Sequence, residues 1–194
     1  MIVASWNINS VRLRLPLLLE YLKARAPDVL CLQELKCTDE QFPRGEIEDA
    51  GYNALIHGQK SWNGVAILSK RPLEETQRGL PGVEDEQSRY LEALTQDETG
   101  KAMRVASIYL PNGNPAGTEK TAYKYAWMDR LRAHARELLA LEEPLVLAGD
   151  YNVIPAPEDV RDPQAWLGDA LFLPETRQRF RALVNLGFTD ALRA

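Results

Sequence analysis

The chain has 194 residues, of which 45% are hydrophobic and 26% are charged, and these values are ordinary for a globular protein with one packed core. The net charge of −5 excludes a protein that holds nucleic acid by bulk positive charge. No apolar run reaches the roughly 18 residues that span a bilayer, and the start MIVASWNI is unlike a secretion signal, so we expect a cytoplasmic protein with no membrane partner.

The first half of the chain alternates short apolar runs with turn residues. Apolar runs of strand length predict strands at 2–8, 28–33, 52–56, 65–69 and 91–95. Leucines at helical spacing predict a helix over 11–26, and a second helix is expected over 39–50. An antiparallel meander is the simplest arrangement for the last three of these strands.

The second half adds longer elements. A strand is predicted over 103–110, a long amphipathic helix over 119–141 and a strand over 145–148 that ends at Gly149-Asp150. A further helix over 175–186 precedes the start of a strand at Phe188. Because no internal repeat or low-complexity linker interrupts the sequence, we expect one α/β domain over 1–194.

Polar side chains gather where the predicted strands end: Asn7, Glu34, Tyr109, Asp150 and Asn152. Taken singly, the asparagines and Asp150 are consistent with turn or helix caps, Glu34 with a solvated strand end and Tyr109 with a half-buried core aromatic. Taken together, they occupy the positions at which α/β folds assemble ligand sites, because rigid sheets hold strand ends in a fixed relation.

Five stretches in order give these residues a family context: SWNINSVR, PDVLCLQELK, HGQKSWNGVAILSK, YLPNG and LAGDYNV. In order and approximate spacing they resemble the exonuclease III family of apurinic/apyrimidinic DNA endonucleases, within the endonuclease/exonuclease/phosphatase superfamily. Each stretch alone is short and degenerate, whereas their ordered combination from Met1 to about Leu192 is specific.

The resemblance implies a fold: a four-layer α/β sandwich similar to pancreatic deoxyribonuclease, with two packed sheets. The family's pattern continues beyond residue 194 with a further acidic metal ligand and a closing Asp-His pair. We therefore expect a domain that is shortened at its C-terminus relative to the family, with an incomplete second sheet. An open sheet edge of this kind favours self-association.

The resemblance also implies roles. Glu34 resembles the principal magnesium ligand, and Asn7 resembles its neighbour at the metal and the scissile phosphate. Asp150 resembles the residue that orients or deprotonates the attacking water, and Asn152 its partner in stabilising the transition state. Tyr109 resembles a phenol near the phosphate or the leaving oxygen. The resemblance thus makes Asn7, Tyr109, Asp150 and Asn152 the catalytic candidates. It makes Asn7, Glu34, Asp150 and Asn152 the candidate ligands of Mg²⁺, for which Mn²⁺ is a possible substitute.

Substrate contacts follow less directly. Lys36, Lys60 and Arg89 are candidate phosphate contacts, and Asn112 in YLPNG is a candidate substrate contact, although exposed basic residues are usually solvated. The family analogy implies double-stranded DNA with abasic sites or 3′ ends as the substrate. It implies a base-excision-repair endonuclease that cleaves 5′ of the lesion, with possible 3′–5′ exonuclease or 3′-phosphodiesterase activity, and a baseless sugar bound in an apolar pocket.

Two alternatives stay open: a catalytically incomplete homologue that binds DNA or has a structural role, and another phosphoesterase of the superfamily. His57 and His134 are expected in a turn and on a helix, outside any catalytic block. Cys31 and Cys37 lack the neighbouring cysteines of a zinc cluster, so two reduced thiols are expected.

Overall fold

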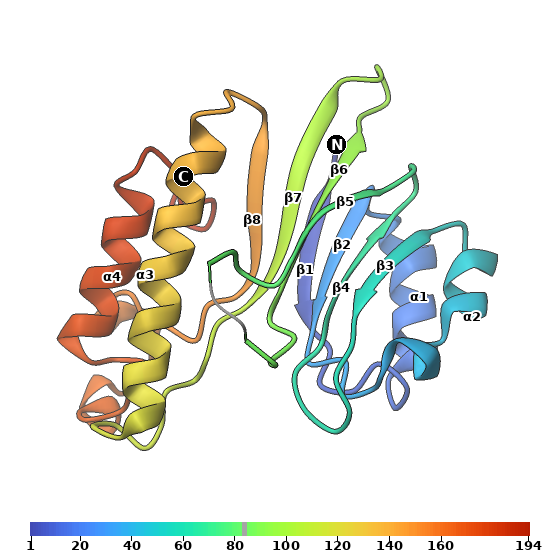
Figure 1. Cartoon of the computed structure of the whole chain (residues 1–194). Coiled ribbons are helices and arrows are strands. Elements are labelled where there is room, and N and C mark those ends of the chain that lie inside the picture. Colours follow the sequence, from blue (N-terminus) through green and yellow to red (C-terminus); the bar gives the residue numbers. More distant parts are fainter. Residues whose placement is uncertain (83–84) are drawn as a thin grey trace. The chain divides into compact units, whose positions relative to one another are not determined.

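The computed structural model describes residues 1–82 and 85–194, and it divides the chain into two compact units. The first unit contains Met1–Tyr109 and Glu142–Asp150, and the second contains Leu110–Leu141 and Tyr151–Ala194. The fold is mixed α/β, as predicted (Figure 1). The expectation that 1–194 works as one domain stays a prediction.

Sheet A of the first unit has the strand order β1-β2-β4-β3. Strands β1 (Val3–Asn7) and β2 (Val29–Gln33) are parallel, and they place Asn7 beside Gln33 at their carboxyl ends. Strand β4 (Val65–Ser69) runs antiparallel to β2 and to β3 (Asn53–His57). All residues of β2 and β4 are buried, which explains why both strands read as continuous apolar runs.

Sheet B of the first unit has the order β5-β6-β7-β8. Strands β5 (Glu74–Arg78), β6 (Tyr90–Gln96) and β7 (Ala102–Tyr109) are antiparallel, with a register shift between Glu75 and Gln77. Strand β8 (Leu145–Asp150) is parallel to β7 and pairs Asp150 with Tyr109. Each sheet thus contains one parallel pair, and a polar residue of the predicted set lies at the carboxyl end of each pair.

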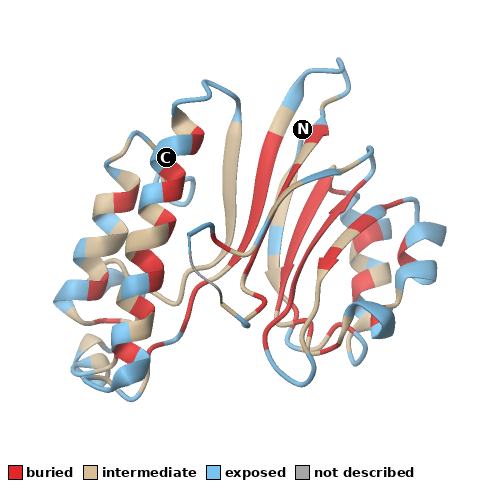
Figure 2. Ribbon diagram, in the orientation of Figure 1, coloured by how far each residue is buried: buried red, intermediate tan, exposed pale blue. Residues whose placement is uncertain are grey.

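The two sheets pack against each other through a buried apolar cluster of Val29, Cys31, Val65, Ile67, Leu91, Ala93 and Val105. Helices α1 (Leu15–Arg25) and α2 (Arg44–Asp49) bury Leu18, Leu22 and Ile47 in the cluster on the outer face of sheet A. Figure 2 shows the buried strands, and parts of α1 and α2, in red. Below the strand ends, Gln33 Nε2 donates to Ser107 Oγ at 3.2 Å, so a polar contact also joins the sheets.

The second unit consists mainly of two helices and their loops. Helix α3 (Glu119–Leu139) is capped by Thr118, whose side chain accepts a hydrogen bond from Lys120 N, and it packs on α4 (Pro174–Val184). Short 3-10 turns lie at Pro157–Asp159 and Pro163–Trp166. In the described parts of the chain, none of the helices combines the length and apolar content that crossing a membrane requires.

Three sequence expectations need correction, and one strand was missed. The strand predicted at 91–95 is not the third strand of a meander, because β6 lies in the other sheet and pairs with β5 and β7. Strand β5 was not predicted, since EETQR has no apolar alternation. The helix predicted over 39–50 is a 3-10 turn at Asp39–Gln41 followed by α2, with Pro43 between them. Phe188 begins no strand, because its N–H closes a turn on Val184 O.

Candidate active site

The first unit brings together four of the predicted residues. Asn7 Nδ2 lies 2.8 Å from Glu34 Oε1 and 2.8 Å from Asp150 Oδ2. One amide nitrogen therefore donates to two carboxylates, one following sheet A and the other ending sheet B. Tyr109, the register partner of Asp150, also hydrogen-bonds Glu34. Residues up to 143 positions apart in sequence form one cluster.

Local backbone geometry turns Glu34 out of its strand. Glu34 and Lys36 both have left-handed backbone, with φ of 56° and 55°, a conformation that side-chain-bearing residues rarely adopt and that costs about 1–3 kcal/mol. Neighbouring loops hold this segment in place, because Ser10 N donates to Glu34 O at 2.7 Å and Lys36 N donates to Asn63 O at 3.0 Å. Such strain at a strand end is typical of a functional site.

A close approach of two strands fixes Asp150. Gly149 lies opposite Ile108, and a Cβ on Gly149 would lie 2.0 Å from Ile108 O. Any larger residue would push β8 away from β7 at this point. Glycine at 149 therefore allows the next side chain, Asp150, to be held at a fixed distance from Tyr109 and Asn7.

The electrostatics of Glu34 favour its ionised form. Burial alone would raise the pKa of Glu34, but hydrogen bonds from Asn7, Lys36 and Tyr109 outweigh burial and lower it. Lys36 Nζ lies 2.9 Å from Glu34 Oε2 and 2.5 Å from Asn9 Oδ1. Glu34 is thus a carboxylate at neutral pH, as a metal ligand needs to be.

Tyr109 has the opposite shift. Burial and the adjacent Glu34 carboxylate raise the pKa of Tyr109 to about 12, so the phenol keeps its proton and serves as a donor. The Arg89 guanidinium lies 4.8 Å from the centre of the Tyr109 ring, and Arg89 Nη1 donates to Tyr109 O at 3.2 Å. Arg89 therefore supports Tyr109 from within the protein, and its predicted contact with DNA stays a prediction.

Asn152 and Asn112 belong to the second unit and lie together there. Asn152 has left-handed backbone with φ of 46°, and its Nδ2 donates to Leu110 O at 2.9 Å. Asn112 Nδ2 lies 3.4 Å from Asn152 Oδ1, at the long end of the hydrogen-bonding range. A buried lysine that the sequence analysis did not single out, Lys124, donates to the backbone carbonyls of both asparagines.

A second residue that the sequence analysis did not single out is Trp62, with 69% of its surface exposed. It lies between Ser61 and Asn63, both with left-handed backbone, in the loop that joins β3 to β4. This loop also carries Lys60 and contacts the Glu34–Lys36 segment through Asn63 O. A large exposed aromatic beside basic residues within HGQKSWNG was the available sequence signal.

The donor set fits a hard cation. Carboxylate and carboxamide oxygens are the ligands that such ions prefer, and the Asn7 amide can rotate to present its oxygen. In residues 1–82 and 85–194, no group of three or more His, Cys, Asp or Glu side chains forms a closed metal cage. Glu34, Asp150 and Asn7 would therefore leave several coordination positions to water or substrate, as an open catalytic site requires.

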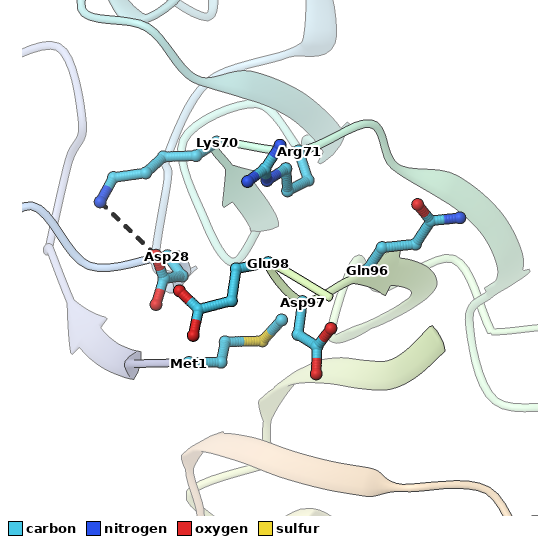
Figure 3. A pocket seen from close by; sticks show the side chains of 7 residues that line it. All are labelled: Met1, Asp28, Lys70, Arg71, Gln96, Asp97 and Glu98. Carbon is cyan, nitrogen blue, oxygen red and sulfur yellow. Dashed lines mark ion pairs between the residues drawn. The ribbon is translucent and has the colours of Figure 1, made fainter. Parts of the chain in front are cut away.

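A separate cluster of charges lies at the other end of the strands, around a cavity of about 200 Å³. Figure 3 shows its lining, Met1, Asp28, Lys70, Arg71, Gln96, Asp97 and Glu98. The Asp28 carboxylate accepts from Ile2 N and pairs with Lys70, and Asp97 accepts from Thr99 and Lys101 in its own turn. Asp28 and Asp97 thus serve local structure, and the cluster of Asn7, Glu34, Tyr109 and Asp150 at the opposite strand ends is the candidate active site.

Comparison with known proteins decides the family. The family model described as Endonuclease/Exonuclease/phosphatase family matches residues 4–191. The chain belongs to this family. Exodeoxyribonuclease III of Haemophilus influenzae is 34% identical over 97% of this chain and 73% of its own length. The DNA repair nuclease APEX1 of Danio rerio is 32% identical over 98% of this chain and 61% of its own length.

Solved structures place the chain in the exonuclease III branch. The 3′ phosphatase NExo from Neisseria, in a variant form bound to a product DNA hairpin, matches with a TM-score of 0.94 and 35% identity. An AP endonuclease from Archaeoglobus fulgidus matches with a TM-score of 0.92 and 33% identity. Both matches cover 100% of this chain and 74% of the solved chain. The chain is therefore a hydrolytic nuclease of the DNA-repair class, in a family that is normally metal-dependent.

Proposed function

We propose that the chain is a magnesium-dependent phosphodiesterase that hydrolyses the DNA backbone 5′ of abasic sites and trims blocked 3′ ends. The observation that carries the proposal is the Asn7 amide held at 2.8 Å from both the Glu34 and the Asp150 carboxylates. The exonuclease III relatives support DNA as the substrate, and the names AP endonuclease and 3′ phosphatase support the two activities. We place this activity in the cytoplasm.

Glu34, Asn7 and Asp150, which lie together in the first unit, are the proposed metal ligands, and the family resemblance adds Asn152. When bound, Mg²⁺ supplies Lewis-acid polarisation of the phosphate and neutralises developing negative charge, and Mn²⁺ would serve similarly. Mg²⁺ suits a site with few carboxylates, because it retains several of its waters.

The protein's own residues would carry the proton and charge movements. Asp150 would accept a hydrogen bond from the attacking water and take its proton as the oxygen–phosphorus bond forms. The bond between phosphorus and the 3′ oxygen breaks in the same step, and this oxygen leaves as a hydroxyl after taking a proton from solvent. Tyr109, which keeps its proton because its pKa is raised to about 12, donates to a phosphate or leaving-group oxygen. Asn7 and Asn152 donate amide hydrogens to oxygens whose negative charge grows in the transition state.

The DNA contacts in this proposal are local. Lys36 and Lys60 would pair with backbone phosphates beside Glu34, and Asn112 would contact the substrate from the second unit. The exposed ring of Trp62 offers a surface on which a base or sugar can stack. These few groups suit a protein of net charge −5, which needs a concentrated contact surface rather than a uniformly basic one.

Incision of a duplex with one abasic-site analogue tests the proposal, with undamaged duplex and 3′-phosphoglycolate ends as comparison substrates. We expect Mg²⁺-dependent incision that Glu34→Gln reduces by about 10²-fold or more and Asp150→Asn by a similar factor in kcat. Glu98→Gln removes a carboxylate from the distant cavity and is the matched control, expected to be normal. DNA binding without any incision by the unaltered chain would refute hydrolysis, and equal incision of undamaged duplex would refute abasic-site specificity.

A further inference from the structure

Lys124 is an unusual residue for its position in the fold. It lies on α3, its side chain is fully buried, and no surface of it is exposed to solvent. Burying an ammonium group costs several kcal/mol unless polar partners compensate for the lost water. A lysine kept in such a position therefore needs partners whose placement it determines.

Those partners are the backbones of the two asparagines described above. Lys124 Nζ lies 3.0 Å from Asn112 O and 2.6 Å from Asn152 O. The two residues are 40 positions apart, on the loops that precede α3 and follow β8. One ammonium group thus joins two loops, each of which carries an amide side chain.

The bond to Asn152 has a specific mechanical effect. Asn152 is held with left-handed backbone, φ of 46°, which a side-chain-bearing residue adopts only when its surroundings impose it. Lys124 holds the Asn152 carbonyl on one side, and the bond from Asn152 Nδ2 to Leu110 O holds the side chain on the other. Backbone and amide are therefore fixed together.

The loop before α3 is built closely around the same lysine. Gly113 follows Asn112, and a Cβ at this position would lie 2.6 Å from Lys124 Cδ. Thr121 Oγ1 donates to Gly113 O at 2.8 Å, and Asn114 Nδ2 donates to the Asp169 carboxylate at 3.1 Å. The lysine stem fills the space under a loop that is itself fixed on both sides.

We propose that Lys124 is a positioning residue of the nuclease, which acts through Asn152 by fixing the Asn152 and Asn112 loops in their reactive arrangement. The inference rests on the proposed function, because it takes Asn152 as a donor to the transition state. Lys124 itself touches no substrate. Its main effect is on kcat, through the orientation of the Asn152 amide, with a smaller effect on DNA affinity through the Asn112 loop.

A double-mutant cycle tests this role. Lys124→Met keeps the length of the side chain and removes the ammonium group, and it is expected to lower kcat about 10- to 10²-fold with KM changed less than about 3-fold. In an Asn152→Ala background the same change should lower kcat less than about 3-fold further, because the group it positions is absent. Losses that multiply in the double variant would overturn the inference.

Chemical rescue separates positioning from general support of the fold. Lys124→Ala leaves a cavity of the size of the missing side chain. Added propylammonium should restore kcat about 5-fold or more with saturation, whereas tetramethylammonium at equal concentration should not. Rescue by both cations equally, or by neither, would overturn the inference. If Lys124→Met does not fold, as judged by its thermal unfolding, Lys124→Gln takes its place in the cycle. Glutamine removes the charge and is too short to reach both carbonyls, so the same loss in kcat is expected.

The outcomes also distinguish this inference from the proposed function. Normal turnover by Asn152→Ala would refute the role of Asn152 in the reaction itself. A large loss in Asn152→Ala together with normal kcat in the lysine variants would leave that role intact and overturn only the positioning by Lys124.

Discussion

The Asn7 amide allows a sharp test, because it separates two carboxylates that would otherwise face each other. In Asn7→Ala two donor contacts of 2.8 Å are lost, and hydrogen bonds to charged groups are worth roughly 1.5–3 kcal/mol each before compensation by water. We therefore expect Asn7→Ala to lower the free energy of unfolding by about 2 kcal/mol in chelator at pH 7.5. For a chain of this size, that corresponds to a fall in Tm of roughly 4–8 °C.

Asn7→Asp should be less stable than Asn7→Ala in chelator, and it should gain more stability from Mg²⁺. A third carboxylate about 3 Å from the other two repels each by roughly 5 kcal/mol at an effective dielectric constant of about 20, before rotation and proton uptake relieve it. With Mg²⁺ at about ten times its Kd, binding stabilises the unaltered chain by about 1.4 kcal/mol. The Mg²⁺-induced rise in Tm should be larger for Asn7→Asp than for the unaltered chain.

Asn53 supplies the matched control for these melts. Its Nδ2 also donates two hydrogen bonds at a strand end, to Ser69 O at 3.2 Å and Arg71 O at 3.0 Å, but both acceptors are neutral carbonyls. Asn53→Asp should therefore show no added response to Mg²⁺. Equal Mg²⁺ shifts in Asn7→Asp and Asn53→Asp would refute the reasoning that Asn7 lies between two charged metal ligands.

Three further predictions concern a phenol, two thiols and a sheet edge. Because the pKa of Tyr109 is raised to about 12, its phenol should stay protonated between pH 7 and 10, and its ionisation should not lower kcat in this range. A fall in kcat over this range that disappears in Tyr109→Phe would contradict a protonated phenol. Burial raises the pKa of Cys31 to about 12 and that of Cys37 to about 11, so an aromatic disulfide reagent at pH 8 should label the native chain only as fast as it unfolds, and rapid labelling would show that either thiol is accessible. Strand β1 is an edge of sheet A and carries no charged residue, so we propose concentration-dependent self-association through it. Ser5→Pro removes an N–H that the parallel ladder directs away from β2, and it should reduce the mass measured by light scattering. An unchanged mass would exclude this edge as the contact.

The strands that sequence analysis identified best are those buried on both faces. VLCLQ and VAILS are continuous apolar runs, and the structure places them as β2 and β4 in the middle of sheet A. Strand β5 escaped detection because its charged residues are stabilised by pairing with β6 rather than by burial of an apolar face. The division into two sheets could not be read from local patterns, since it depends on which strands pair.

The candidate site was partly predictable for a similar reason. Asn7, Glu34, Tyr109 and Asp150 end strands, and a strand end is visible in the sequence. The bridging position of Asn7 between two sheets depends on packing and was not visible. Lys124 left a signal that was not used: it falls on the helix stripe that also buries Thr121, Trp127, Met128 and Leu131, where a lysine requires a polar partner.

The bond between Asn7 and Asp150 also has a consequence for biosynthesis. It joins residues 143 positions apart, so almost the whole first unit must leave the ribosome before the two can meet. Sheet A contains only residues before 70 and can form early, whereas β8 is made some eighty residues later. A nascent chain would thus carry a folded sheet with Glu34 in place yet have no means of hydrolysing DNA. On the proposed function, nuclease activity therefore requires β8 to join the sandwich.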